Sequence, residues 1–263
     1  HIVDEYSFSP AELPLTDREI QLIKRVDQVF IHSPALLERK GHFNPHTLFV
    51  PNGVNYQAFA SHQEEPADLK SISHPRIGYI GVVKAQLDLR LLLGLATRHV
   101  EWSFVFVGPR NSLGRDALLV EELSKLSNVH FLGHKPIEIA CAYPQHMDVC
   151  LLPYKTNDYT KYIYPLKLHE YLAGGKPIVG TPIRSLSDFA HVIQLANTPE
   201  EWSRAISESL ARNEMSSDQI HLRRNIAKQV DWGTLVHRVG GSICERLGSP
   251  YSDQFAALQL EAL

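Results

Sequence analysis

Sulfur-containing residues and long apolar runs are both scarce in this sequence. Its 263 residues include three cysteines and two methionines. Cys141, Cys150 and Cys244 form no Cys-x-x-Cys pair and each sits among apolar residues, which favours buried, reduced thiols over a disulfide framework or a metal site. Reduced thiols are typical of a cytoplasmic protein. No run approaches the roughly 18 apolar residues of a membrane-spanning helix.

The sequence also lacks an excess of either charge. It has 26 Lys and Arg against 29 Asp and Glu, a formal net charge of -3. Proteins that bind nucleic acid need clustered Lys and Arg to neutralise phosphates, so we expect no nucleic-acid partner. Residues 1–6 hold an acidic pair where a signal peptide is basic and then apolar. With 44% hydrophobic and 21% charged residues, the composition is that of an ordinary globular protein, which excludes a disordered, collagenous or coiled-coil chain.

Several motifs that bind cofactors or metals, or carry nucleophiles, are missing. The sequence contains no Gly-x-Gly-x-x-Gly, no P-loop and no Gly-x-Ser-x-Gly. His169-Glu170 does not begin a His-Glu-x-x-His zinc motif, because position 173 is Ala. The absence of an Asp-x-Asp pair disfavours metal-dependent sugar transfer. We therefore expect no metal and no cofactor.

What the sequence does contain is a regular alternation of apolar runs and amphipathic stretches. The runs cover residues 28–31, 47–50, 76–80, 103–107, 128–132, 148–152, 177–180 and 191–195. Most are continuously apolar, which is typical of strands buried on both faces. Helical patterns lie between them, at 17–26, 34–40, 88–98, 115–126, 136–143, 166–173 and 199–211. This order predicts an α/β protein with a doubly wound parallel sheet, complete within residues 75–197.

The chain changes character outside that unit. After about residue 198 the strands stop, and helical patterns follow at 217–229 and 232–247, with a weakly patterned tail. Two seams interrupt the earlier part, at 41–44 and at the polar segment 61–74, which we interpret as a surface loop.

The loops after four of the strands carry glycine and basic residues. Ligands of a doubly wound sheet bind at the carboxyl ends of its strands. The loops contain, in chain order, Gly81, Val82, Val83 and Lys84; Gly108, Pro109 and Arg110; Gly133, His134 and Lys135; and Pro153, Tyr154 and Lys155. Glycine lets a ligand approach the backbone, and Lys or Arg suits phosphate. In any one loop the glycine could simply turn the chain, but the recurrence predicts a shared anion site.

The most informative stretch is residues 164–179. Pro165 fits the first position of a helix, so the free amides of Leu166 and Lys167, the helix dipole and the Lys167 ammonium would form a diphosphate site. Glu170 shares their helix face and could accept both hydroxyls of a ribose. The alternative is that Glu170 is only a first-turn acid facing the dipole. Gly174-Gly175 is expected to end the helix.

Residues 164–179 resemble the signature helix of the GT-B glycosyltransferases, close to the family 4 type (glycosyl transferases group 1) that builds bacterial polysaccharides. Supporting motifs follow in the order typical of that family, at residues 50–54, 77–81, 104–109, 129–133 and 148–153. The resemblance runs from about residue 1 to 245 and implies a Rossmann-like donor domain with extra C-terminal helices. It maps residues 1–46 to the end of an incomplete acceptor domain, 47–230 to the nucleotide-sugar-binding domain, and 231–263 to a crossover helix and tail. Because most of the acceptor domain is absent and the chain does not begin with Met, we expect a fragment without turnover of its own.

The resemblance also implies roles and partners. Lys84 and Lys167 would hold the diphosphate and stabilise the leaving group, Glu170 would hold the ribose, and the neighbourhood of Lys135 would line the base pocket. Many members carry two glutamates eight positions apart; Glu170 matches the second, but position 162 is Tyr. The donor would be UDP- or GDP-linked, and the acceptor a glycan or a lipid-linked glycan at the inner membrane surface. A nucleotide-sugar epimerase on the same scaffold and a non-catalytic nucleotide-binding module remain alternatives, and the sugar, the base and the stereochemical outcome stay open.

Overall fold

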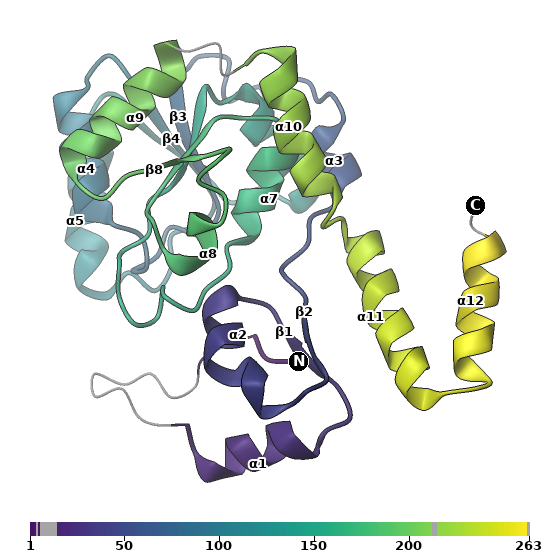
Figure 1. Ribbon diagram of the computed structural model, residues 1–263. Coiled ribbons are helices and arrows are strands. Elements are labelled where there is room, and N and C mark those ends of the chain that lie inside the picture. The colour runs from purple at the N-terminus through teal and green to yellow at the C-terminus, as the bar shows by residue number, and fades with distance from the viewer. Residues whose placement is uncertain (4, 6–14, 212–214, 262–263) are drawn as a thin grey trace.

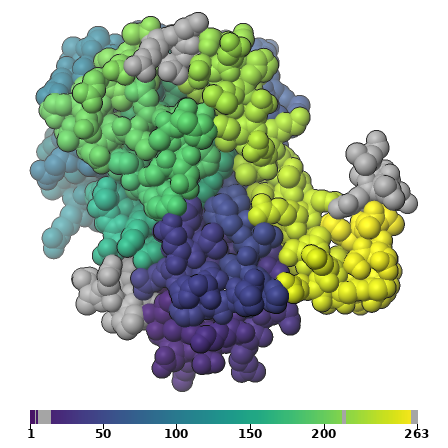
Figure 2. Space-filling model, in the orientation of Figure 1, coloured from purple at the N-terminus to yellow at the C-terminus, as the bar shows by residue number. Residues whose placement is uncertain are grey.

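The computed structural model describes residues 1–3, 5, 15–211 and 215–261. Its largest part is a six-stranded parallel sheet with helices on both faces. A smaller N-terminal unit lies below this sheet, and two C-terminal helices extend to one side (Figure 1). Figure 2 shows the N-terminal unit packed directly against the larger domain.

The central sheet has the strand order β5-β4-β3-β6-β7-β8. Its strands are β3 (Arg76–Ile80), β4 (Ser103–Val107), β5 (Val129–Gly133), β6 (Val149–Leu152), β7 (Ile178–Gly180) and β8 (Gln194–Leu195). Each neighbouring pair is parallel. The predicted doubly wound sheet is thus confirmed, and its topological switch point lies between β3 and β6. The last strand is shorter than the predicted 191–195, because Val192 and Ile193 bond back to Phe189 in a turn.

Helices cover both faces of this sheet. They are α3 (Tyr56–Ala60), α4 (Leu89–Arg98), α5 (Ala117–Ser124), α6 (Ile137–Ala140), α7 (Leu166–Ala173), α8 (Arg184–Ser187), α9 (Pro199–Ala211) and α10 (Ser217–Lys228). The predicted helices at 115–126 and 136–143 are shorter, and each is joined to a 3-10 turn, at Gly114–Asp116 and Tyr143–His146. The short helices α3 and α8 were not predicted. All five residues of β3 and of β4 are buried, as their apolar runs predict.

The N-terminal unit forms a second, smaller parallel sheet. It contains α1 (Asp17–Arg25), β1 (Val29–Ile31), α2 (Pro34–Lys40) and β2 (Thr47–Phe49), with β1 paired to β2. Because β2 pairs with β1 rather than with the central sheet, the unit reaches Phe49, beyond the predicted boundary at residue 46. The seam predicted at 41–44 is wrong: Gly41–Phe43 forms a 3-10 turn, and the buried Asn44 amide donates to the Ile23 and Val26 carbonyls at 2.7 and 2.8 Å.

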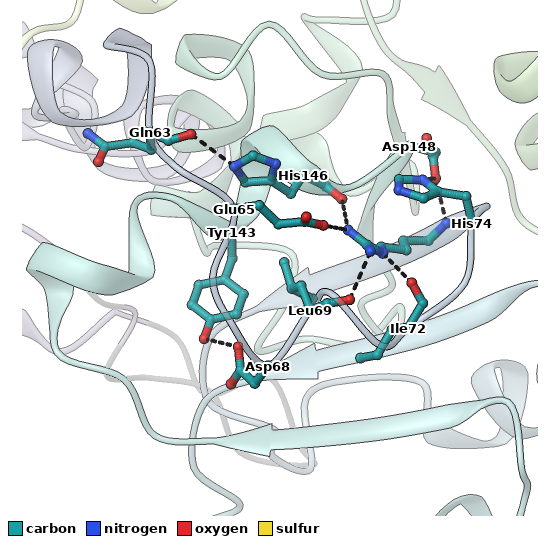
Figure 3. A network of polar contacts seen from close by, with 10 residues as sticks. Gln63, Glu65, Asp68, Leu69, Ile72, His74, Tyr143, His146 and Asp148 are labelled. Carbon is teal, nitrogen blue, oxygen red and sulfur yellow. Dashed lines mark hydrogen bonds and ion pairs between the residues drawn. The ribbon is translucent and has the colours of Figure 1, made fainter.

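The polar segment 61–74 was predicted to be a surface loop, and this is confirmed, since most of its residues are exposed or partly exposed. The segment has no helix or strand, but Leu69 and Ile72 are buried in the main core. The buried Arg76 guanidinium donates to the Leu69 and Ile72 carbonyls, each at 2.8 Å, and pairs with Glu65 at 2.5 Å. Figure 3 shows these acceptors converging on one point at the start of β3. Two buried apolar side chains and the hydrogen bonds of Arg76 therefore fix this surface loop to the core.

The C-terminal helices form a hairpin. Helix α11 (Trp232–Leu247) is capped by Gly248, and α12 (Tyr251–Glu261) folds back beside it (Figure 1). Phe255 of α12 packs on Gly240 and Gly241 of α11. The sequence was expected to end in a weakly patterned tail, so α12 was not predicted. No helix within the described residues is both long and apolar enough to cross a membrane. Cys141 and Cys150 are buried as expected, whereas Cys244 is only partly buried, so that expectation is wrong for Cys244.

Candidate functional site

The carboxyl edge of the central sheet brings the predicted glycine loops side by side. The Gly81 amide donates to the Val107 carbonyl at 2.7 Å, and the Gly108 amide donates to the Gly133 carbonyl at 2.8 Å. One loop further along, the buried Val83 donates to Pro109 at 2.9 Å. The backbone pairing of β3, β4 and β5 thus continues past the strand ends and fixes the three loops against one another.

Gly81 and Gly108 hold positions that other residues cannot fill. Both have positive φ, +147° and +140°, which side-chain-bearing residues rarely adopt. A Cβ on Gly108 would lie 2.2 Å from the Gly81 carbonyl oxygen, and a Cβ on Gly81 would lie 1.9 Å from Cε of Lys167. The close approach predicted for Gly81 is therefore made by the Lys167 side chain, which lies directly across it.

Helix α7 places Lys167 at this edge. The helix begins at Leu166, as its pattern predicts. Pro165 was predicted to be its first residue, but it has an extended backbone with ψ of 120° and precedes the helix, whose N-terminus has no side-chain cap. The first amides of a helix have no partner within it, and they point along the positive end of its dipole. Gly174-Gly175 ends the helix as predicted, with Gly175 at φ +73° and the Lys176 amide donating to the Tyr171 carbonyl at 3.1 Å.

A cavity of about 240 Å³ opens where the loop after β3, the loop after β6 and the start of α7 meet the N-terminal unit. Its lining comprises Val3, His32, Tyr79, Val82, Lys84, Gln86, Tyr154, Tyr159, Ile163, Pro165, Leu166 and Lys167. The structure thus brings both predicted lysines to one cavity, together with the predicted Val82, Tyr154, Pro165 and Leu166. Gly81, Val83 and Pro153 lie in the same loops without lining it.

Lys167 and Glu170 change each other's pKa values, and Lys84 adds to the effect on Lys167. Burial lowers the pKa of Lys167, and the nearby Lys84 ammonium lowers it further, against the opposing effect of Glu170. Burial raises the pKa of Glu170, opposed by Lys167. The first turn of α7 holds no acidic residue, so the alternative of a first-turn acid at Glu170 is wrong. Two cations forced together in a partly dehydrated site favour an anionic ligand, because the ligand removes their mutual repulsion.

The remaining predicted residues lie along the same edge but outside this cavity. The Arg110 guanidinium stacks over Phe131, 4.9 Å from the ring centroid, and contacts Ser124. Lys135 pairs with Asp68 at 2.7 Å, and its neighbour His134 is exposed. Gly108 and Pro109 lie in the loop after β4, bonded as described above. These residues follow the ends of β4 and β5, in the region that the resemblance assigns to the base.

Sequence analysis missed several residues of the cavity, of which His32, Gln86 and Tyr159 are polar. His32 directly follows strand β1, so the rule that ligands meet the carboxyl ends of strands could have found it. Tyr159 belongs to a loop without pattern, and no signal pointed to it. Within the described residues, no group of three or more His, Cys, Asp or Glu side chains could hold a metal ion.

Comparisons with known proteins agree with this architecture. A Bacillus subtilis (strain 168) protein named "Putative teichuronic acid biosynthesis glycosyltransferase TuaH" is 31% identical over 237 residues, covering 84% of this chain and 57% of that protein. A trehalose-phosphate synthase (UDP-forming) from Burkholderia xenovorans has the same fold, with a TM-score of 0.68 at 12% identity over 90% of this chain and 64% of its own. The pneumococcal O-GlcNAc transferase GtfA, solved with UDP and GlcNAc, has a TM-score of 0.61 at 13% identity, over 89% of this chain and 48% of its own.

This chain therefore spans little more than half of the curated relative that it matches. The sequence profile described as glycosyl transferases group 1 matches residues 74–212, from the end of the polar segment through α9. That range is more than half of the chain and contains every strand of the central sheet together with both cavity lysines. The chain belongs to the family of glycosyl transferases group 1.

Proposed function

We propose that this chain is the donor-binding portion of a glycosyltransferase of bacterial polysaccharide biosynthesis. The observation that carries the proposal is the cavity at the switch point, where Lys84 and Lys167 flank the uncapped start of α7. Ammonium groups and helix-terminal amides are the groups that bind a diphosphate. The donor would be a UDP- or GDP-linked sugar, and the acceptor a glycan or a lipid-linked glycan.

The same groups suit the bond that breaks. Transfer cleaves the bond between the anomeric carbon of the sugar and the diphosphate oxygen, and the leaving nucleoside diphosphate keeps the electron pair. Preorganised positive charge next to that oxygen is worth several kcal/mol in a water-poor site. Lys84, Lys167 and the α7 amides would supply this charge, while Glu170 would accept the ribose hydroxyls and so fix the nucleotide half.

The relatives support the choice of substrate class. The 31% identical protein is named for teichuronic acid biosynthesis, a polysaccharide pathway, and a solved protein of the same fold holds UDP. UDP is therefore the first nucleotide to test, and GDP the second. A lipid-linked acceptor would bring the protein to the cytoplasmic face of the inner membrane.

A thermal-shift panel of UDP, GDP, ADP and their sugar derivatives tests the proposal. A ligand at a hundredfold excess over its Kd stabilises the folded chain by about 2.7 kcal/mol. We expect UDP or GDP to raise the melting temperature of the wild type and of the surface control Lys70→Ala, but not of Lys84→Ala. A panel in which no nucleotide stabilises the wild type would overturn the proposal.

A further inference from the structure

The loop after β5 is held from outside the sheet by one carboxylate. Asp68, from the polar segment 61–74, pairs with the Lys135 ammonium at 2.7 Å. Its other oxygen accepts a hydrogen bond from the Tyr143 hydroxyl at 2.8 Å. The Lys135 ammonium also lies 6.0 Å from the centre of the Tyr143 ring. The three side chains therefore form one closed cluster, which joins the polar segment to the loop.

The segment that carries Asp68 is itself fixed to the core. The next residue, Leu69, is buried, and its carbonyl accepts from the Arg76 guanidinium at 2.8 Å. The Leu69 amide donates to the Pro66 carbonyl at 2.9 Å, which closes a turn that contains Asp68. Tyr143 is buried as well, and Figure 3 shows its hydroxyl meeting Asp68 beside the contacts of Arg76. The carboxylate is thus a fixed anchor for the Lys135 side chain.

The electrostatics of the cluster keep this carboxylate charged. Burial alone would raise the pKa of Asp68, but the hydrogen bonds from Lys135 and Tyr143 outweigh it, so the pKa lies below its usual value. Burial raises the pKa of Tyr143, and the hydrogen bond to Asp68 raises it further. At neutral pH the cluster therefore consists of an ion pair and a neutral hydroxyl donor.

The backbone of the loop contrasts with its anchored side chain. Gly133, the last residue of β5, accepts from the Gly108 amide at 2.8 Å. Beyond it, no backbone group of the described residues bonds to the amides or carbonyls of His134 and Lys135. A Cβ on Gly133 would meet no atom of the described residues within 4 Å, so the space beside the loop is open. The loop thus presents backbone donors and acceptors to an open space, and the Asp68–Lys135 pair fixes it there.

We propose that Asp68 is a positioning residue for the nucleobase of the donor. By holding Lys135, it fixes the backbone of residues 133–135 where the resemblance puts the base. A backbone amide and a carbonyl offer one hydrogen-bond donor and one acceptor, which matches the edge of a pyrimidine or a purine base. This inference rests on the proposed function, and it adds a residue that governs base binding without touching the ligand.

Paired substitutions separate positioning from a general effect of charge. Asp68→Asn removes a negative charge and Lys135→Met removes a positive one, so a purely electrostatic effect on an anionic ligand would have opposite signs in the two variants. Loss of positioning instead lowers the affinity for UDP or GDP in both, by about three- to fivefold, as the weakening of a neutral hydrogen bond predicts. The double variant should lose no more than either single variant, because both substitutions break the same contact.

Calorimetry with UDP and GDP, and with inorganic pyrophosphate as a competitor, measures these effects. Pyrophosphate has the diphosphate but no base, so its affinity should change by less than about twofold in every variant. Glu65→Gln is the matched control, since Glu65 is also a paired acid of the segment 61–74 but bonds to Arg76 at 2.5 Å. It should keep its affinity for both kinds of ligand, whatever its melting temperature. Lys135 is partly exposed, so Lys135→Met tests the same contact where Asp68→Asn does not fold.

Hydrogen exchange of the ligand-free protein tests the anchor directly. Peptides that cover residues 130–138 should exchange faster in Asp68→Asn than in the wild type, whereas Glu65→Gln should leave them unchanged. Equal losses for nucleotide and pyrophosphate, opposite changes in the two single variants, or an unchanged exchange rate would overturn the inference while the proposed function stands. A wild type that binds no nucleotide would overturn both.

Discussion

The two faces of helix α7 contrast sharply although their residues alternate in one short stretch of sequence. On one face, Leu166 and Lys167 line the cavity, and Glu170 is close enough to Lys167 to change its pKa. On the other face the polar groups bond to protein. The Tyr171 hydroxyl accepts from the Ile80 amide at 2.8 Å, and His169 pairs with the Tyr164 hydroxyl at 2.8 Å. One face of the helix therefore bonds to the fold, and the other presents its charged groups to the cavity, where we propose that a ligand binds.

The largest expected effect tests the buried face and depends on pH. Burial lowers the pKa of His169 from 6.5 to about 4. The imidazole binds protons more readily in the unfolded chain, so its contribution to stability is complete above pH 6.5 and is lost as the pH falls towards about 4. A tenfold difference in proton affinity between the folded and unfolded chains corresponds to about 1.4 kcal/mol, so the wild type should lose about 3 kcal/mol between pH 7 and pH 4 through this residue.

Urea unfolding of the wild type and of His169→Phe across that pH range measures the difference. The variant should be less stable at pH 7, because Tyr164 loses its partner, but its stability should fall less as the pH is lowered. Nucleotide affinity at pH 7 should be the same in both proteins. Parallel pH profiles would show that His169 is not the group that titrates.

The next effect tests the cavity face. Lys167→Ala removes one of the two ammonium groups that would hold the diphosphate. Hydrogen bonds to charged groups are worth about 1.5–3 kcal/mol, so calorimetry should show nucleotide affinity falling about tenfold to a hundredfold. Stability should hardly change, since burial already disfavours the charged form of Lys167 in the folded chain and so lowers its pKa.

Lys135→Ala is the matched control for Lys167→Ala. Lys135 is also a cation of the carboxyl edge, but it pairs with Asp68. Its loss should cost at most about 1 kcal/mol of stability, as for other partly exposed ion pairs, and should lower nucleotide affinity much less than Lys167→Ala does, because Asp68 already pairs with its charge. If both variants lost the same affinity, the distinction between paired cations and cavity cations would be wrong.

Tyr171→Phe gives a smaller change on the buried face. The substitution keeps the ring and removes the hydroxyl, which leaves the buried Ile80 amide without its acceptor. An orphaned buried donor costs about 1–3 kcal/mol, so the urea midpoint should fall while nucleotide affinity is retained. A loss of affinity without a loss of stability would assign Tyr171 to the cavity face instead.

The contrast between the two faces also marks what the sequence could predict. The apolar runs located β3, β4 and β6 to within one residue, because strands buried on both faces must be continuously apolar. Pro165 and Gly174-Gly175 located α7, since proline and glycine constrain the backbone locally. The helical period then placed Glu170 on the face of Lys167, as the structure has it.

The rest depended on contacts between distant parts of the chain. Lys84 and Lys135 are equivalent in the sequence, each basic and each following a strand and a glycine. They differ in the structure because Lys135 pairs with Asp68, from the polar segment 61–74, whereas Lys84 lines the cavity. His32 lines the cavity because Tyr162 and Arg184 hold the N-terminal unit against the segments that follow β6 and β7. Contacts between residues so far apart in the chain produce no local pattern in the sequence.

The smallest expected effect concerns Glu170, which shares the face of Lys167. Glu170→Gln keeps the shape and removes the charge, so two charge-assisted hydrogen bonds to a ribose would become weaker neutral ones. Affinity for UDP or GDP should fall roughly tenfold, about 1.4 kcal/mol, in calorimetry.

Burial raises the pKa of Glu170, which means that the charged form is disfavoured in the folded chain at neutral pH, so stability should stay the same or rise slightly. A carboxyl with a raised folded pKa stabilises most at low pH and loses that contribution as the pH rises through the raised value, so any gain in the variant should shrink on acidification. Glu138→Gln, an exposed acid in the first turn of α6, is the matched control and should change neither quantity by more than a few tenths of a kcal/mol. Equal nucleotide affinities for wild type and Glu170→Gln would show that Glu170 does not hold the nucleotide. Lys167 and the α7 amides would then be the groups of the cavity face that do.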